Sequence, residues 1–170
     1  MARDAAFHLL SKGYKRLAVV SAHDARAQRR RDAFCDAAVT AGSAPPLQFN
    51  VDGPASISFG RQALHDLISQ GFSSGAVFCS SDILAHGVLI EGQAQGIAVP
   101  ETIGVLGFGD QDFAASLVPT LSSIGIDRQE LGNRAADALV QAIAFKTRSE
   151  TVINIGYQIF ERGSLSNHGD

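Results

Sequence analysis

Short, uninterrupted apolar runs alternate with longer stretches of helical periodicity along this chain. The apolar runs cover residues 17–20, 48–51, 76–79 and 103–108. Three of them show no polar alternation, which is typical of strands covered on both faces in a parallel sheet; the run at 48–51 is weaker. Helical stretches, with apolar residues on one stripe, cover residues 3–12, 26–41, 58–70 and 81–95. This alternation predicts an α/β fold with a doubly wound, mainly parallel sheet and helices on both faces.

The pattern changes after residue 108. A loop leads to a short strand candidate at 122–126, and Asp127-Arg-Gln-Glu130 has the form of a capping box that opens a helix to residue 145. A final extended stretch, 151–160, ends in a polar tail. We therefore expect three segments: a main lobe at 1–126, a helical segment at 127–150, and a returning strand with the tail at 151–170.

Composition narrows the class of protein. The 170 residues carry a net charge of −3 and are 45% hydrophobic, which suits one domain with a real core. The chain has no apolar run of the roughly 18–20 residues that cross a bilayer, and its first residues lack the apolar stretch of a signal peptide. We expect a cytoplasmic protein that has no contact with a membrane.

Catalytic and metal-binding motifs are missing from the sequence. The chain shows no Walker-type loop, nucleophile elbow or dinucleotide fingerprint, and its five histidines have no recognisable metal-ligand spacing. We therefore predict no metal, no cofactor and no catalytic residue.

Ligands of open α/β sheets bind beyond the carboxyl ends of the strands, which selects the loops 21–30, 80–82 and 107–112. Arg30 lies on the apolar stripe of its helix, near the helix start. There its guanidinium can point over the sheet edge and hold a hydroxyl pair or a carboxylate. The alternative is an arginine whose aliphatic stem covers core surface.

Two acidic residues follow strands. Asp82 falls in the first turn of a helix, where a carboxylate complements the helix dipole whether or not it binds a ligand. Asp110 follows Gly107-Phe-Gly109, whose glycines let the backbone turn sharply and approach a ligand. A turn-forming role explains Asp110 equally well.

The helical stretch 81–95 is apolar on two sides. One side carries Leu84 and Val88, and the other carries Ile83, His86 and Ile90. Because the sheet covers only one side, the second side predicts contact with a symmetric partner subunit or with another helix of the same chain.

Five segments resemble the LacI/GalR family of sugar-responsive transcriptional repressors, in the order of that family. The segments are Gly13-Tyr-Lys-Arg-Leu-Ala18, Arg30-Arg-Asp-Ala-Phe34, Ser80-Ser-Asp82-Ile-Leu-Ala85-His-Gly87, Ile97-Ala-Val-Pro100-Glu-Thr-Ile-Gly-Val-Leu-Gly107-Phe-Gly-Asp110 and Pro119-Thr-Leu-Ser-Ser-Ile124. Their family counterparts are Gly-His-x-x-Ile-Ala, Arg-x-x-Gly-Phe, Asn-Asp-x-x-Ala-x-Gly, Val-Pro followed by Val-Gly-Phe-Asp-Asp, and Pro-x-Leu-Thr-Thr-Val. Each motif is weak by itself, but five in order across nearly the whole chain are specific.

The resemblance implies the C-terminal lobe of a type I periplasmic-binding-protein-like sensor. It places a DNA-binding headpiece and most of a first lobe before the position of Met1, so DNA contact would run only through that headpiece. It also implies an effector between two lobes, and a homodimer formed through the 81–95 helix. The implied ligand-binding residues are Arg30, Ser81, Asp82, Gly109 and Asp110. The expected dimer contacts are Ile83, His86 and Ile90, with Leu117 and Val118 added from the loop beyond Asp110.

Two departures from the family pattern bear on the effector. Gly109 stands where many sensors of neutral sugars carry an Asp, so repulsion against an anionic ligand is removed while Arg30 remains to pair with one. The Gly-Phe-Gly-Asp form resembles the gluconate-repressor branch, which favours a sugar acid over a neutral sugar. Ser81 replaces the family's Asn and shortens a hydrogen-bonding arm.

We expect the effector-sensing lobe of a regulator. The alternatives are a small α/β enzyme that uses Asp82 or Asp110 as a base on a sugar phosphate, and a fragment of a periplasmic sugar receptor. By resemblance, the apolar face of the helical segment at 127–150 packs on the missing first lobe. In this chain we expect that face to pack against a second copy or to cover the open face of its own lobe, which leaves the effector cleft blocked or incomplete.

Overall fold

The structure is a computed structural model that describes residues 1–145 and 152–168. Residues 146–151 and 169–170, at the ends of the two C-terminal segments expected above, lie outside the described residues. A six-stranded sheet with the order β2-β1-β3-β4-β5-β6 forms the centre. The strands are β1 (Leu17–Ser21), β2 (Leu47–Asn50), β3 (Gly75–Cys79), β4 (Ile103–Phe108), β5 (Ser122–Gly125) and β6 (Gln158–Phe160).

The sheet is mainly parallel, as the alternation of apolar runs predicts. The first five strands pair in parallel, and β6 pairs antiparallel with β5. β1, β4 and β5 are buried throughout, and β3 is buried except at its first residue, whereas the edge strand β2 alternates between partly buried and exposed positions. This alternation explains why the run at 48–51 is the weakest in the sequence.

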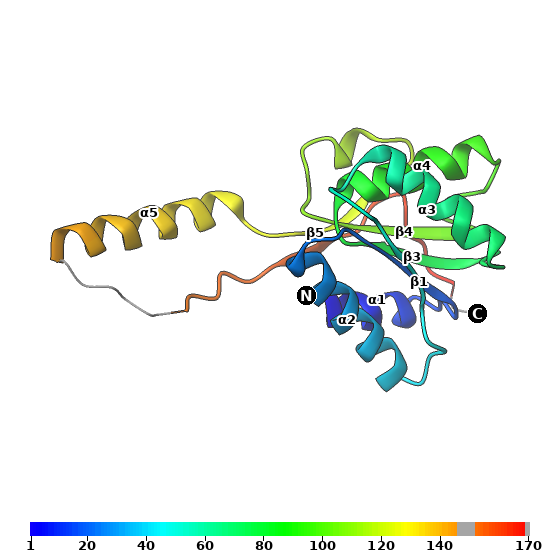
Figure 1. The fold of residues 1–170 in the computed structure, drawn as a ribbon, viewed down its shortest axis with the longest axis horizontal. Helices are drawn as coiled ribbons and strands as arrows, with labels where there is room; N and C mark the ends of the chain where they lie inside the picture. Colours follow the sequence, from blue (N-terminus) through cyan, green and yellow to red (C-terminus); the bar gives the residue numbers. More distant parts are fainter. Residues whose placement is uncertain (146–151, 169–170) are drawn as a thin grey trace.

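Helices cover both faces of the sheet (Figure 1). The helices are α1 (Ala2–Ser11), α2 (Ala25–Thr40), α3 (Ile57–Ser69), α4 (Asp82–Ala94) and α5 (Arg128–Phe145), with a 3-10 turn at Ala114–Ser116. α1 and α2 pack together on one face, and α3 and α4 pack on the other. The fold class predicted from the sequence is therefore confirmed.

Local chemistry fixes where these helices begin and how closely they pack. The Asp24 carboxylate accepts from the backbone N–H groups of Arg26 and Ala27 and caps α2. α3 and α4 meet at Gly60 and Gly87, where a Cβ on either residue would collide with the backbone of the other helix. Close packing of this pair therefore requires glycine at both positions.

The segment after β6 runs back along the lobe and is bound to it. Ser164 is fully buried; its hydroxyl donates to the carbonyl of Val105 over 2.7 Å and accepts from the N–H of Ser122 over 2.8 Å. Farther on, the N–H of His168 donates to the carbonyl of Lys12 over 2.6 Å. Residues 161–168 are thus joined by hydrogen bonds to β4, to β5 and to the end of α1.

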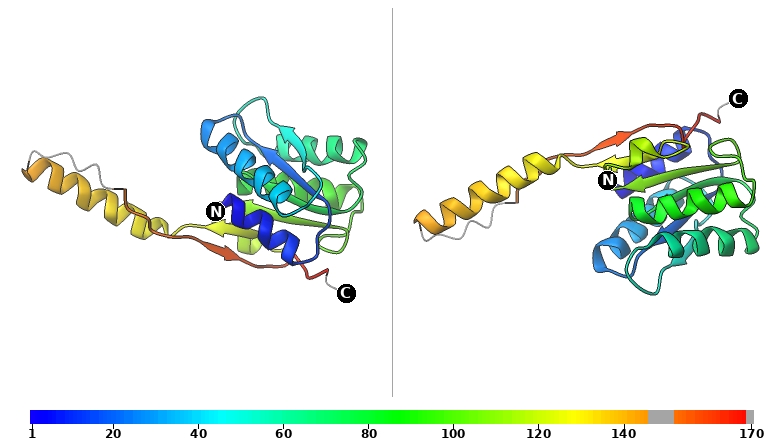
Figure 2. Two further views of the ribbon diagram at one scale, coloured as in Figure 1. Left: turned by 90° about the horizontal axis from the view of Figure 1, so that it is seen from below. Right: turned by 90° about the horizontal axis from the view of Figure 1, so that it is seen from above.

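Helix α5 stands away from the lobe, with the returning segment 152–157 near it (Figures 1 and 2). Leu139 is 62% exposed and Ile143 is 70% exposed. The expectation that α5 covers the open face of its own lobe is therefore wrong, because the short connection after β5 directs the helix outward rather than back over the sheet. Packing against a second copy or a further lobe stays a prediction.

Across the described ranges, none of the helices has both the length and the apolar character needed to cross a membrane.

Candidate functional site

A depression of about 280 Å³ lies at the carboxyl ends of β1, β3 and β4. It is lined by Ala22, Asp24, Arg26, Arg30, Ala55, Ser80, Ser81, Phe108 and Gly109. Three of the predicted ligand residues, Arg30, Ser81 and Gly109, meet here. The parallel register of the central strands brings their ends to one edge, and this is why loops far apart in sequence line one depression.

Arg30 is held in place by two contacts. Its Nη1 donates to the carbonyl of Ser80 over 3.1 Å, and its guanidinium carbon lies 3.7 Å from the centroid of the Phe108 ring. Partial burial lowers the pKa of the guanidinium, an effect that Asp24 opposes. The group remains charged and is fixed at the mouth rather than extended along the helix surface. The structure thus favours the position over the sheet edge, and ligand contact stays a prediction.

Ser81 lines the same depression. Its Oγ is buried, and within the described part of the chain it has no hydrogen-bond partner. Although Ser81 is the N-cap residue of α4, its side chain does not cap the helix. A buried hydroxyl without a partner is costly, so a hydrogen bond to a ligand would stabilise this group, and ligand contact of Ser81 stays a prediction.

Asp82 does not line the depression. Its Oδ1 accepts from the Ser123 hydroxyl over 2.6 Å, and its Oδ2 accepts from the Gln111 N–H over 2.6 Å. The residue is 1% exposed, and burial raises the pKa of its carboxyl against the opposing effect of these hydrogen bonds. Asp82 therefore binds the start of α4 to β5 and to the loop after β4. The predicted ligand contact of Asp82 remains untested.

The loop over 107–112 turns where the sequence has glycine. Gly109 has a φ of 125°, and Asp110 has a φ of 46°, in the left-handed region that aspartate tolerates better than most residues. A Cβ at Gly107 would collide with the Asp82 carboxylate. The sharp turn is the one that the sequence predicts, whereas the close approach seen here is to Asp82, and approach to a ligand stays a prediction.

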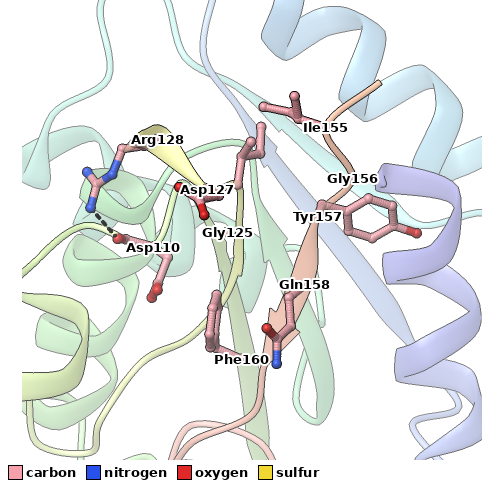
Figure 3. Close-up of a pocket in the computed structure, with 10 residues that line it drawn as sticks. Asp110, Gly125, Asp127, Arg128, Ile155, Gly156, Tyr157, Gln158 and Phe160 are labelled. Atoms are coloured by element: carbon pink, nitrogen blue, oxygen red, sulfur yellow. Dashed lines mark hydrogen bonds between the residues drawn. The ribbon is translucent and has the colours of Figure 1, made fainter. Parts of the chain in front are cut away.

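Asp110 faces a second cavity, of about 460 Å³, at the neck between the lobe and α5 (Figure 3). The Arg162 Nη1 lies 2.8 Å from the Asp110 Oδ1, and the Arg128 Nη2 donates to the Asp110 carbonyl over 3.0 Å. Arg128 also pairs with Asp112 over 2.9 Å. The turn that carries Gly109 is thus joined to the first residue of α5.

The predicted dimer surface lies on α4 and on the loop between β4 and β5. Ile83, His86 and Ile90 are each partly exposed, and the His86 ring lies 5.5 Å from that of Phe113. Val118 is 88% exposed, whereas Leu117 packs against the core of its own lobe. Self-contacts therefore bury only part of this surface.

Three residues that the sequence analysis did not single out position the site: Phe108, Ser123 and Arg162. Phe108 is the last residue of a strand, so the rule that selects strand ends covers it. Ser123 lies within a short strand and Arg162 in a polar segment, and no local pattern distinguishes their roles. In the described ranges 1–145 and 152–168, no group of three His, Cys, Asp or Glu side chains is placed to hold a metal.

Known proteins resemble this chain over almost its whole length. Residues 6–165 match the family model of the periplasmic binding protein-like domain. The HTH-type transcriptional regulator GntR of Pseudomonas aeruginosa is 38% identical over 163 residues, which are 94% of this chain and 47% of that protein. The HTH-type transcriptional regulator IdnR of Escherichia coli is 30% identical over 89% of this chain and 46% of its own length.

A solved structure agrees with this match. The crystal structure of transcription regulator GntR from Chromobacterium violaceum superposes with a TM-score of 0.90 at 30% identity, over 99% of this chain and 62% of that one. The chain belongs to the periplasmic-binding-protein-like family. Within it, the chain is a member of the LacI/GalR group of transcriptional regulators, as its motifs predict. It spans about half the length of the curated relatives that it matches.

Proposed function

We propose that this chain is the effector-sensing lobe of a LacI/GalR-type transcriptional regulator and works in the cytoplasm. The observation that carries the proposal is the placement of Arg30 beside Ser81 and Gly109, in the depression at the carboxyl ends of the parallel strands. A fixed guanidinium and a hydroxyl without a partner offer charged and neutral hydrogen bonds to one small polar ligand. A sugar or sugar acid fits these groups.

The proposed mechanism is a shift of population between two arrangements of lobes. A ligand that binds one arrangement better than the other favours it, and an attached DNA-binding headpiece follows. The 107–112 loop is suited to transmit such a shift, because it borders the depression at Gly109 and contacts Arg128 at the start of α5. In this account Asp82 and Asp110 position the loop.

We also propose a homodimer in which Ile83, His86 and Ile90 of α4 meet a second copy. These residues are partly exposed on a helix whose other side is buried on the sheet. Val118 is exposed and is proposed to join this interface, whereas Leu117 packs against the core of its own lobe. Isologous contact through one helix is the simplest way to bury such a surface.

An enzymatic role is disfavoured by the partners of the two acids. A general base needs a free carboxylate within reach of a substrate proton, but Asp82 accepts two hydrogen bonds inside the lobe and Asp110 is paired with Arg162. The relatives are regulators rather than enzymes.

The coding sequence before Met1 provides the test. A continuous reading frame for a first lobe and a helix-turn-helix headpiece supports the proposal. A signal peptide in that frame supports the periplasmic receptor instead. Turnover of a sugar phosphate that is abolished in Asp110→Asn would support the enzyme and overturn the proposal.

A further inference from the structure

Two arginines, not one, line the depression. Arg26 lies in the first turn of α2 and Arg30 one turn later, so both guanidinium groups reach the same side of the helix. Their surroundings differ. Arg30 is fixed against Phe108 and Ser80, whereas the Arg26 side chain is 84% exposed and its Nε lies 3.7 Å from the Asp24 carboxylate.

Among the residues that the structure describes, Asp24 is the only acidic side chain that lines this depression, and it already accepts hydrogen bonds. Its Oδ1 accepts from the N–H groups of Arg26 and Ala27 at the start of α2. The lining therefore carries two positive charges against one negative charge. Gly109 adds no side chain to the lining, and the nearby Asp82 carboxylate is buried and does not line the depression.

We propose that Arg26 is the residue that selects an acidic effector over a neutral one of the same shape, an inference that rests on the effector-binding function proposed above. Arg30 forms part of the floor and donates to whichever oxygen lies over Phe108, so it serves neutral and acidic ligands alike. Arg26 exchanges its loose contact with Asp24 for the carboxylate of the ligand. An exposed, flexible guanidinium gains little from a neutral hydroxyl, because water replaces that bond at nearly the same free energy.

The test uses gluconate and glucitol, two open-chain polyols that differ at one end, where gluconate has a carboxylate and glucitol a hydroxymethyl group. Each is titrated into the labelled 170-residue chain at matched sodium concentration, and amide proton–nitrogen spectra follow the residues of the depression. Such spectra detect weak, local binding even if a second lobe is needed for full affinity. The wild-type chain is expected to bind gluconate more tightly than glucitol.

Four variants separate the roles. Arg26→Gln should weaken gluconate about three- to tenfold and leave glucitol unchanged. Arg30→Gln should weaken both ligands. Asp24→Asn keeps an N-cap residue and removes the competing charge, so it should strengthen gluconate only. Arg29→Gln, an exposed neighbour outside the depression, is the matched control and should change neither ligand.

The possible outcomes are distinguishable. If Arg26→Gln keeps the full preference for gluconate, or weakens glucitol equally, the selective role of Arg26 is wrong while the effector site stands. If neither ligand shifts the amides of the depression in the wild-type chain, the proposed effector site itself fails, and this inference fails with it.

Discussion

The Arg30 guanidinium carbon lies 3.7 Å from the centroid of the Phe108 ring, which joins a helix on one face of the sheet to the end of a central strand. The same side chain donates to the Ser80 carbonyl at the end of the neighbouring strand. Arg30 thus bridges two strand ends and leaves part of its guanidinium for a ligand. A cation over an aromatic ring contributes about 0.5–2 kcal/mol, enough to orient the group before a ligand arrives.

Replacement of Arg30 by alanine should weaken effector binding by about 1.5–3 kcal/mol, the range of a charge-assisted hydrogen-bond contact. Isothermal titration of a protein that contains this lobe and a first lobe measures the change, with Arg29→Ala as the matched control. Wild-type affinity in the Arg30 variant would show that the guanidinium serves only to hold the lobe together.

Replacement of Asp82 by asparagine should destabilise the lobe by about 1–3 kcal/mol. An asparagine has one acceptor oxygen for these two donors: its amide N–H faces either the Gln111 N–H or the Ser123 hydroxyl, which already accepts from the Asp110 N–H, and the charge of the acceptor is lost. Urea unfolding measures the free energy, and Asp112→Asn on the exposed part of the loop is the control. Equal stability of wild type and the Asp82 variant would contradict the positioning role.

The difference in unfolding free energy between wild type and Asp82→Asn should depend on pH. Burial raises the pKa of the Asp82 carboxyl above its ordinary value of 3.8, so the native state retains this proton at a pH where the unfolded chain has lost it. The resulting cost to stability is absent below 3.8 and grows as pH rises through the raised pKa. The free-energy advantage of wild type over Asp82→Asn should therefore widen as pH falls from neutral toward 3.8. If this free-energy advantage instead becomes smaller as pH falls, the hydrogen bonds to Asp82 lower its pKa more than burial raises it.

The sequence predicts the sheet well because its strands are buried on both faces. The uninterrupted apolar run at 103–108 is typical of a central strand that is covered on both faces, and β4 spans those same residues. The side chains of the site are less predictable. Asp82 follows a strand as a ligand residue would, but its direction depends on Ser123, which lies 41 residues away in sequence. Helix α5 is predictable from the periodicity of its sequence. What it packs against is not, because that depends on tertiary contacts that local periodicity does not encode.

Charge on the exposed side of α4 should dissociate the proposed dimer. Ile90→Asp places a carboxylate in an apolar contact and should give a monomer of unchanged fold in sedimentation experiments, since Ile90 is only partly buried in its own chain. Val39→Asp, at a 51% exposed apolar residue on α2, is the control. A wild-type chain that sediments as a monomer at tens of micromolar would rule out this interface.

Charge on α5 tests what that helix packs against. Leu139→Asp with Ile143→Asp should reduce self-association, seen by light scattering, and leave the melting temperature of the lobe unchanged, because both residues are exposed in their own chain. A large loss of thermal stability would instead place α5 on its own lobe. If self-association is unchanged, α5 does not pack against a second copy of the chain.

The most direct measurement is a crystal structure, with gluconate, of a protein that contains this lobe and a first lobe. The account predicts the ligand beside Ser81 and Gly109, with an oxygen within hydrogen-bonding distance of the Arg30 guanidinium. Gluconate bound elsewhere, for example in the neck cavity beside Arg128 and Tyr157, or an Arg30 side chain that stays on Phe108 without touching the ligand, would contradict it.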